Sequence, residues 1–253
     1  MLCRTYVVAV LINLLPLGIF AKTSFRVGLV EGGPAAILKA RDSTPQGAAP
    51  IFFEKYIFPE LKKKFDLEVS WDLSPAPRLF RELSNGHLDM LCFVAKTPER
   101  EKLYAFSSVE MFHETGVLIV HMDSFPGKDS IPPQDLTGKT IGQLIGTYIP
   151  DFYSLYKVKI LEISGDDVSQ RISDLVNNKR IDGAFILLQE TAQYLVQSNN
   201  LKHLKVVKLT DWPPVTVTAA YRKDIDPALK SFIDDLLRKH KGQFEELIKS
   251  YMK

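Results

Sequence analysis

Strand-like and helix-like segments alternate along most of this chain, and that alternation restricts the possible folds more than any other feature. Short apolar runs at 25–30, 88–94, 140–145 and 181–187 have the length and composition of buried strands. Amphipathic spacing typical of helices lies between such runs, for example over 76–85. This order is typical of α/β proteins with mostly parallel sheets, because a crossover helix joins consecutive parallel strands.

One phrase occurs twice in the chain. LSNGHLDM at 83–90 and LVNNKRIDG at 175–183 each end a helix and start a buried strand, and each carries an aspartate, Asp89 or Asp182. Junctions between helices and strands often use Asn, Gly and Asp, so coincidence is one explanation. The other is that the chain forms two lobes of similar plan, each with its own sheet.

Proline and glycine predict where several helices end. We expect a helix over 49–65, which Pro59 kinks or divides because proline cannot donate a backbone hydrogen bond. Gly86 ends the helix before it, since glycine readily adopts the left-handed conformation. The C-terminal region is expected to form two helices, at 227–239 and at 242–252.

Composition and motifs exclude several classes of function. The chain has 253 residues, 45% of them hydrophobic, and a net charge of +2, which is too small to indicate a nucleic-acid partner. The signatures HExxH, GxSxG, GxGxxG and the P-loop do not occur, and the five histidines lack metal-ligand spacing. We therefore expect no cofactor, no bound metal and no covalent chemistry.

The first 21 residues have the layout of a secretory signal peptide. Arg4 precedes an apolar run over 6–20, and Ala21 is a small residue suited to cleavage. The run is short for a membrane span, although an uncleaved anchor is the alternative. We expect residues 1–21 to be removed and the mature protein to be exported. Cys92 is then the single cysteine, expected in the core without a disulfide.

The segment 76–108 carries the most informative motif. It reads R-x-x-x-x-L-x-x-G-x-x-D, an apolar strand, T-x-x-R and F-S, and the matching residues are Arg78, Leu83, Gly86, Asp89, Thr97, Arg100, Phe106 and Ser107. Three further matches follow in order: DLTGKTIGQLIGTY at 135–148, RIDGAF at 180–185 and AAYRKD at 219–224. In these motifs the chain resembles the extracellular solute-binding proteins of family 3, the polar amino-acid class of type II periplasmic binding proteins.

The resemblance implies two α/β lobes joined by two crossover strands, with a ligand in the cleft between them. Mapped onto this chain, lobe 1 consists of residues 22–114 and 212–253, and lobe 2 of residues 115–211. The strand at 115–121 and the Pro213-Pro214 segment carry the two crossovers. A hinge needs only a few residues that absorb backbone rotation, and closure then buries the ligand.

The resemblance also nominates an anion site. In amino-acid-binding members, the Arg of T-x-x-R holds the carboxylate of the ligand, and here that residue is Arg100. A guanidinium suits this role because its planar fork donates two parallel hydrogen bonds to a carboxylate. The alternative is a surface ion pair between Arg100 and Glu99 or Glu101. Thr97, which begins the motif, is a further candidate for contact with the ligand.

Four further residues are candidates for the same cleft. The hydroxyl of Thr147, with the amides after Gly146, is expected to donate to the anion at a helix N-terminus, unless Thr147 only caps that helix. Arg78 either faces the cleft as a second cation or lies on a solvated helix face. Tyr148 and Trp212 are either stacking walls of the cleft or packing aromatics.

Three positions depart from the amino-acid-binding pattern. Ala95 stands where a small hydroxyl residue is usual, Leu187 stands where an acid usually pairs with the ammonium of the ligand, and the expected aromatic near Pro34 is missing. A buried ammonium without a counter-charge is costly. The ligand is therefore expected to be a carboxylate or another small polar solute without an amine.

The resulting expectation is a monomeric periplasmic protein that delivers a small solute to the permease of an ABC-type transporter or to a sensor. A dehydratase of cyclohexadienyl acids on the same scaffold is an alternative, and it needs a general acid. Glu31, Glu110 and Glu190 are candidates for that acid by sequence position. A stand-alone sensory module is a further alternative.

Overall fold

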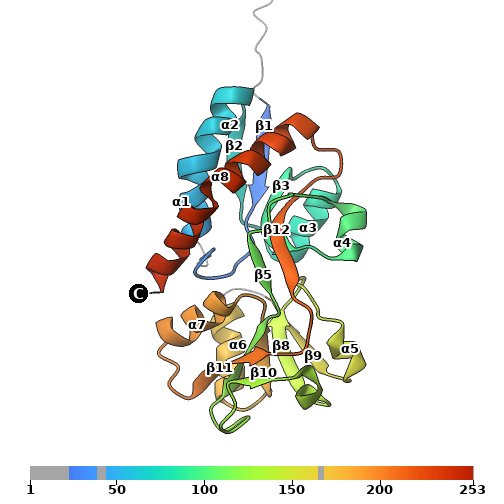
Figure 1. Cartoon of the computed structure of the whole chain (residues 1–253), viewed down its shortest axis with the longest axis vertical. Coiled ribbons are helices and arrows are strands. Elements are labelled where there is room, and N and C mark those ends of the chain that lie inside the picture. Colours follow the sequence, from blue (N-terminus) through green and yellow to red (C-terminus); the bar gives the residue numbers. More distant parts are fainter. Residues whose placement is uncertain (1–22, 39–43, 165–167, 253) are drawn as a thin grey trace, which may run out of the picture.

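The computed structural model describes residues 23–38, 44–164 and 168–252, and these residues form two lobes (Figure 1). Each lobe is built around a six-stranded sheet. The chain passes from the first sheet to the second and back again. The two-lobed α/β architecture with two crossovers is therefore confirmed, whereas the predicted signal peptide at 1–21 lies outside the described residues.

The sheet of lobe 1 has the strand order β2-β1-β3-β12-β4, with β5 also paired to β12. Its strands are β1 (Ser24–Gly28), β2 (Glu68–Asp72), β3 (Met90–Ala95), β4 (Ala105–Phe106), β5 (Phe112–Glu114) and β12 (Val215–Tyr221). β1 pairs in parallel with β2 and β3, whereas β12 runs antiparallel to β3. A strand from the C-terminal part of the chain therefore completes the first sheet.

The helices of lobe 1 include the segment that proline was predicted to divide. They are α1 (Ala48–Phe52), the π-helical turn η1 (Phe53–Ile57), α2 (Phe58–Phe65), α3 (Ala76–Ser84), α4 (Pro98–Leu103) and α8 (Pro227–Tyr251). Pro59 lies at the start of α2, directly after the wider π-helical turn. Because proline cannot supply a backbone N–H there, the regular helix is interrupted, as predicted.

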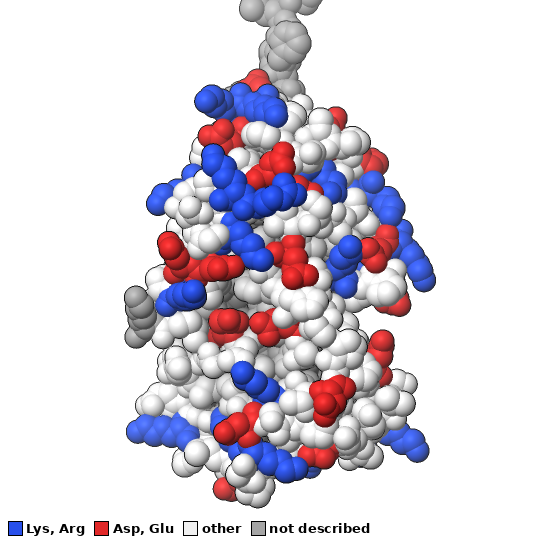
Figure 2. Space-filling view, viewed as in Figure 1, with Lys and Arg blue, Asp and Glu red and all other residues white. Residues whose placement is uncertain are grey.

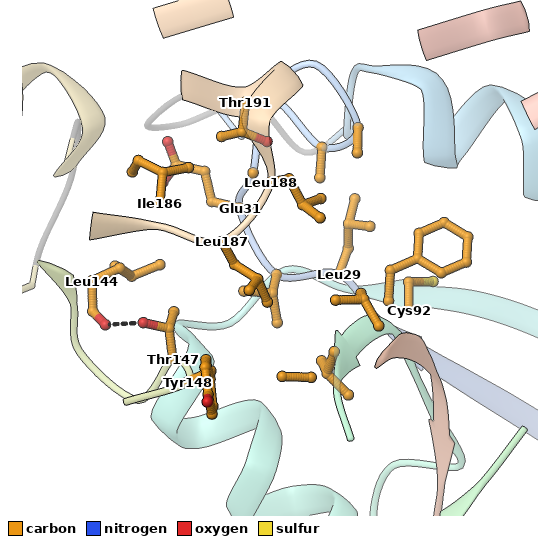
Figure 3. Close-up of a pocket in the computed structure, with 18 of the residues that line it drawn as sticks. Leu29, Glu31, Cys92, Leu144, Thr147, Tyr148, Ile186, Leu187, Leu188 and Thr191 are labelled. Atoms are coloured by element: carbon orange, nitrogen blue, oxygen red, sulfur yellow. Dashed lines mark hydrogen bonds between the residues drawn. The ribbon is translucent and has the colours of Figure 1, made fainter. Parts of the chain in front are cut away.

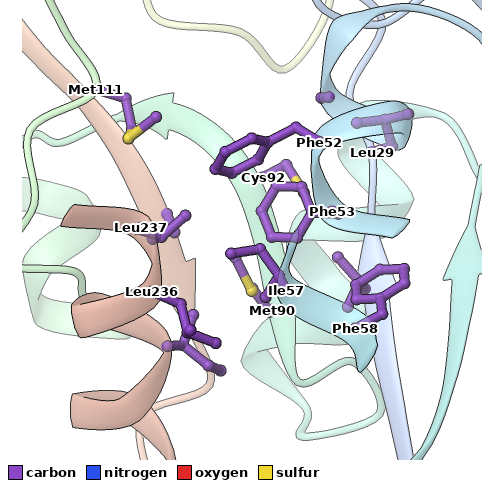
Figure 4. Packing of buried hydrophobic residues seen from close by; sticks show 14 of the residues in the cluster. Leu29, Phe52, Phe53, Ile57, Phe58, Met90, Cys92, Met111, Leu236 and Leu237 are labelled. Carbon is purple, nitrogen blue, oxygen red and sulfur yellow. The ribbon is translucent and has the colours of Figure 1, made fainter. Parts of the chain in front are cut away.

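One apolar cluster fixes α1, η1 and α8 against the sheet of lobe 1 (Figure 4). Its labelled members include Phe52, Phe53, Ile57, Met90, Cys92, Leu236 and Leu237, and all of them are buried. Full burial of such a large side chain stabilises the fold by roughly 1.5–3 kcal/mol. Cys92 lies among them, which confirms its predicted place in the core.

The C-terminal region forms one continuous helix, α8, rather than the two helices predicted from the sequence. Gly242 lies within it, where glycine costs only about 1 kcal/mol relative to alanine. Leu237, Phe244 and Ile248 recur at helical spacing on the buried side and pack into the core of lobe 1. Burial of this stripe outweighs the weak helix propensity of one glycine.

The sheet of lobe 2 has the strand order β7-β11-β6-β10-β8-β9. The elements of this lobe are β6 (Val117–His121), β7 (Ser130–Ile131), the 3-10 turn η2 (Pro133–Leu136), β8 (Thr140–Leu144), α5 (Phe152–Leu155), β9 (Lys159–Ile163), α6 (Val168–Asn177), β10 (Gly183–Ile186), α7 (Gln189–Ser198) and β11 (Leu204–Leu209). α6 and α7 pack on one face of the sheet and α5 on the other. The predicted strands and helices of this segment are thus present.

The repeated phrase performs the same structural task in both lobes. Asp89 accepts a hydrogen bond at Oδ2 from the backbone N–H of Arg26 (2.8 Å), and its own N–H donates to the Arg26 carbonyl (3.0 Å). Asp182 makes the same pair of bonds with Thr140, at 2.8 and 2.9 Å. Each aspartate therefore directly precedes one strand and binds the backbone of the neighbouring strand, at Arg26 within β1 or at Thr140 in β8, so the two junctions are equivalent.

Two short segments connect the lobes. β5 continues into β6 through Thr115 and Gly116, and β11 returns to β12 through residues 210–214. The hydroxyl of Thr115 donates to the carbonyl of Leu209 (3.1 Å), which ties the two connections together. Gly116 has a φ of +89°, and a side chain there would overlap the Phe185 ring, so glycine is required at this crossover.

Lys and Arg are interspersed with Asp and Glu over the face seen in Figure 2. No described helix combines the length and the apolar character needed to cross a membrane. Within the same described ranges, no group of three or more His, Cys, Asp or Glu residues is placed to hold a metal ion.

Candidate functional site

A cavity of about 170 Å³ lies between the two lobes and is lined by residues of both. Lobe 1 contributes the loop after β1, the end of β3 and part of α3, while lobe 2 contributes the ends of β8 and β10 and the start of α7. In Figure 3, Leu29, Cys92, Leu187 and Leu188 surround this space, and Tyr148 lies at its edge. Apolar side chains make up most of the lining.

Arg100 reaches this cavity from the short helix α4, and several contacts fix its position. Thr97 caps that helix by accepting a hydrogen bond from the Arg100 backbone N–H (3.3 Å). Nη1 of Arg100 donates to the carbonyl of Ala95 (3.0 Å), and the guanidinium carbon lies 4.4 Å from the centre of the Phe80 ring. The guanidinium is therefore held by a carbonyl and an aromatic face of lobe 1.

No described carboxylate pairs with Arg100. The predicted alternative, an ion pair with Glu99 or Glu101, is not observed, because Glu101 pairs with Lys96 instead (3.1 Å). Several other arginines do pair with aspartates: Arg26 with Asp72, Arg222 with Asp89 and Arg238 with Asp235. Arg100 therefore differs from these arginines in having no counter-charge among the described residues.

Burial lowers the pKa of the Arg100 guanidinium below its usual value, with Tyr104 opposing the shift. Arginine nevertheless stays protonated in proteins at neutral pH. A buried cation without a counter-charge is unfavourable, and an anion brought next to it relieves that cost. The site is thus chemically suited to bind a small anion.

The same guanidinium also links the lobes. Nη2 of Arg100 donates to the carbonyl of Gly146 in lobe 2 (3.2 Å). Gly146 has a φ of +77°, and a Cβ there would lie 3.0 Å from Pro77 of α3, while one on Gly33 would lie 2.9 Å from the Tyr194 ring of α7. These close approaches at two places describe a closed arrangement of the lobes.

Residues 27–253 match the family of bacterial extracellular solute-binding proteins, family 3. This chain belongs to that family. Membership agrees with the resemblance seen in the sequence motifs and with the two lobes around a cavity. No curated protein sequence matches the chain.

Three solved structures show the same two-lobed fold as this family 3 protein. The substrate-binding protein AbpA of an amino acid ABC transporter from Streptococcus pneumoniae, bound to L-arginine, has a TM-score of 0.74 at 18% identity, covering 90% of this chain and 94% of AbpA. The periplasmic domain of BvgS from B. pertussis gives 0.70 at 19% identity, covering 91% and 43%. The ancestral amino-acid-binding protein AncCDT-1, a precursor of cyclohexadienyl dehydratase, gives 0.69 at 19%, covering 91% and 95%.

Thr147 lines the cavity of this family 3 protein, but its hydrogen-bond donors are already used. Its hydroxyl donates to the carbonyl of Leu144 (2.6 Å), and its backbone N–H donates to the same oxygen (3.3 Å). No helix begins at Thr147, since α5 starts at Phe152. The prediction of an anion site at a helix N-terminus is therefore corrected. The positive φ of Gly146 turns the chain back onto Leu144 instead.

Arg78 and Thr97 do not line the cavity. Arg78 is exposed on α3, which corresponds to the solvated alternative. Its neighbour Pro77, which the sequence did not single out, lies against Gly146 of lobe 2, where an added Cβ would be 3.0 Å from it. Thr97 acts through the helix cap that positions Arg100, so its predicted ligand contact is replaced by a supporting role.

Of the two aromatic candidates, Tyr148 is a cavity-lining residue and Trp212 is not. Tyr148 lines the cavity, and burial raises the pKa of its hydroxyl. Trp212 packs edge-on against Phe152, with ring centres 5.2 Å apart, within the core of lobe 2. Tyr194, which approaches Gly33 across the cleft, was missed because no motif marks it within its helix.

Of the three acids considered for catalysis, Glu31 alone is among the described residues that line the cavity. Glu110 accepts a hydrogen bond from the Thr216 hydroxyl (2.8 Å) at an exposed position. Oε2 of Glu190 is buried and has no hydrogen-bond partner among the described residues. Leu187, at the position that is acidic in amino-acid binders, does line the cavity.

Proposed function

We propose that this protein captures a small anionic solute between its lobes and delivers it to a membrane transporter or a sensor. The observation that carries the proposal is the guanidinium of Arg100, which lines the cavity and has no ion pair within the described ranges. Of the five N–H donors of an arginine, Arg100 uses two on the carbonyls of Ala95 and Gly146. The remaining donors have no hydrogen-bond partner among the residues that the structure describes, so they can bind a carboxylate.

Closure of the lobes around the solute strengthens its binding in this proposal. Separation of the lobes at Gly116 and residues 210–214 breaks the contact between Arg100 and Gly146 and opens the cavity to water. A solute that meets Arg100 in the open form is then enclosed when the lobes close. Exclusion of water strengthens the attraction between the guanidinium and the anion, because the local dielectric constant falls.

The lobe boundaries and the cellular location belong to the same proposal. Lobe 1 comprises residues 22–114 and 212–253, lobe 2 comprises residues 115–211, and cleavage after residue 21 releases a monomer into the periplasm. The family of extracellular solute-binding proteins supports this location. The likeness to AbpA, a substrate-binding protein of an amino acid ABC transporter, favours delivery to an ABC-type transporter. A sensor is the alternative partner.

A thermal-shift screen of the mature protein tests this proposal. Small carboxylates, α-amino acids, amines and neutral sugars are added separately, and the melting temperature is recorded. A ligand that binds only the folded state stabilises it by about 2.7 kcal/mol at a concentration of 100 times its Kd. We expect carboxylates to raise the melting temperature. Stabilisation by amines or sugars alone contradicts the proposal.

A second candidate function is a dehydratase of cyclohexadienyl acids. Two observations support it: Glu31 lines the cavity, and the fold matches a precursor of cyclohexadienyl dehydratase. In this case Glu31 acts as the general acid that protonates the leaving group. Incubation with prephenate and arogenate, followed by ultraviolet detection of aromatic product, tests it, with Glu31→Gln as the inactive control. Absence of product from the wild-type protein excludes this reaction.

A further inference from the structure

We propose that the ligand is a monocarboxylate with an apolar body, about the size of one benzene ring or a six-carbon chain, and without an ammonium group. This inference rests on the proposed function, because it places the carboxylate at Arg100. It departs from the sequence-based expectation of a polar solute. The reasons are the size of the cavity, the chemistry of its walls and the position of its charges.

The size of the cavity sets the size of the ligand body. Its volume is about 170 Å³. An engineered apolar cavity of roughly 150 Å³, lined by Leu, Ile and Phe, stays dry and binds benzene. The space between the lobes therefore accommodates one ring or a short aliphatic chain, with the carboxylate directed to Arg100. Larger solutes require the lobes to stay further apart than they do here.

The walls of the cavity favour an apolar body. The apolar side chains around it include Leu29, Val30, Phe80, Cys92, Phe93, Val94, Leu144, Leu187 and Leu188. They come from both lobes, so a body placed between them is covered by apolar side chains from two sides (Figure 3). Each buried CH₂ group then strengthens binding roughly fourfold. A polar body would instead bury groups for which these side chains offer no hydrogen bond.

The charges around the cavity disfavour an amine. Leu187 stands at the end of β10 and faces the cavity, so an α-ammonium meets an aliphatic side chain there. Glu31 is the single acidic side chain among the described lining residues. In Figure 3 its carboxylate points away from Leu187 and Tyr148. Arg100 itself repels a cation, and Glu31 is directed away from Leu187, so an ammonium beside Leu187 finds no matching charge.

Calorimetric titration of the mature protein with four six-carbon ligands, and with acetate as a short carboxylate, tests the inference. The probes are hexanoate, 2-aminohexanoate, 6-aminohexanoate, hexylamine and acetate. We expect hexanoate to bind at least tenfold more tightly than each of the others. Acetate lacks the apolar body. 2-Aminohexanoate places an ammonium near Leu187. 6-Aminohexanoate places an ammonium at the end of the chain opposite the carboxylate, and its affinity tests whether Glu31 can pair with that ammonium. The pair 3-phenylpropanoate and L-phenylalanine repeats the comparison with a ring.

The outcomes that overturn the inference are specific. Equal or tighter binding of either aminohexanoate shows that the cavity accepts an ammonium. Equal binding of acetate shows that the apolar body contributes nothing. Failure of both hexanoate and 3-phenylpropanoate to bind also overturns it. The first two outcomes leave the proposed function standing, because the carboxylate still binds. Unchanged hexanoate affinity in Arg100→Ala contradicts the proposed function instead.

A substitution at Leu187 tests the missing counter-charge directly. In Leu187→Asp, the ratio of affinities for 2-aminohexanoate and hexanoate should shift at least tenfold toward the amino acid. Leu187→Asn has a similar size but no charge, and it should leave that ratio within about threefold of the wild-type value. Circular dichroism checks that both variants fold. If Leu187→Asp does not fold, the wild-type comparison of hexanoate with 2-aminohexanoate decides the question alone. A folded Leu187→Asp variant with an unchanged ratio overturns the assignment of Leu187.

Discussion

Nη2 of Arg100 lies 3.2 Å from the carbonyl oxygen of Gly146, so one guanidinium from lobe 1 contacts the backbone of lobe 2 beside the cavity. The proposed ligand contact and the closed arrangement therefore depend on the same side chain. A carboxylate that neutralises Arg100 also removes the cost of burying this charge when the lobes close. Binding and closure are thus coupled through a single residue.

The crossover at Gly116 should tolerate no side chain. Gly116→Ala introduces a left-handed alanine, which costs about 1–2 kcal/mol, and its Cβ also overlaps the Phe185 ring. Gly86→Ala is a matched control, because Gly86 has a φ of +72° but nothing within 4 Å of its Cβ. Urea unfolding should show a larger loss of unfolding free energy for Gly116→Ala. Equal losses would mean that the overlap with Phe185 is unimportant.

Asp89 and Asp182 should contribute unequally to the free energy of unfolding. Removal of either one leaves a backbone N–H of a strand without its partner, which costs about 1–3 kcal/mol. Asp89→Ala should cost more than Asp182→Ala, because Asp89 pairs with Arg222 at 3.0 Å and is 18% exposed. Asp182 pairs with Lys139 at the longer distance of 3.4 Å and is 41% exposed. Chemical unfolding of both variants measures this order, with the Asn substitutions as controls that retain an acceptor oxygen. The reverse order would contradict the assigned contacts.

Stability should depend on pH through Asp234 of α8. Burial raises the pKa of this carboxyl, but hydrogen bonds from Ser107, Ser108 and Lys230 lower it more, so the net pKa lies below its usual 3.8. The stabilisation is therefore complete above pH 3.8 and is lost as the pH falls through the folded-state pKa. Urea unfolding between pH 7 and pH 3 should show the difference between wild type and Asp234→Asn narrowing in acid.

The neighbouring Asp235 provides the control for this pH dependence, since its side chain is 67% exposed. Asp235→Asn should change the unfolding free energy little at any pH, because exposed ion pairs contribute about 0–1 kcal/mol. A constant difference between wild type and Asp234→Asn across the whole pH range would contradict the role of ionised Asp234.

The continuity of α8 predicts a stabilising substitution. Gly242 lies within the helix, and a Cβ there meets nothing within 4 Å. Gly242→Ala should therefore raise the unfolding free energy by about 0.5–1 kcal/mol, since alanine loses less backbone entropy than glycine in a helix. Thermal unfolding followed by circular dichroism measures the change. A lower melting temperature would indicate that α8 needs a flexible point at this position.

The sequence predicted the fold because burial patterns repeat along the chain. The apolar runs at 88–94 and 181–187 reflect strands that helices cover, and their periodicity is a local property. The continuity of α8 was not predicted, because Gly242 is a local signal whereas the packing of Phe244 and Ile248 is a tertiary one. Local patterns therefore identified the elements better than their exact ends.

The site was harder to predict than the fold, because a cavity between two lobes depends on the direction of each side chain. The T-x-x-R motif placed Arg100 on the cavity, and the missing acid placed Leu187 there. Neither the turn of Thr147 onto Leu144 nor the approach of Tyr194 to Gly33 has a sequence signature. Both follow from a positive φ or from the packing of one lobe on the other.

Calorimetric titration of a stabilising carboxylate into the wild type, Arg100→Ala and Arg78→Ala tests the central claim most directly. Arg78 is the matched control, an exposed arginine that does not line the cavity. The account predicts that Arg100→Ala loses about 1.5–3 kcal/mol of binding free energy, the value of a charge-assisted hydrogen bond, whereas Arg78→Ala binds as the wild type does. Unchanged affinity in Arg100→Ala, or an equal loss in Arg78→Ala, would contradict it.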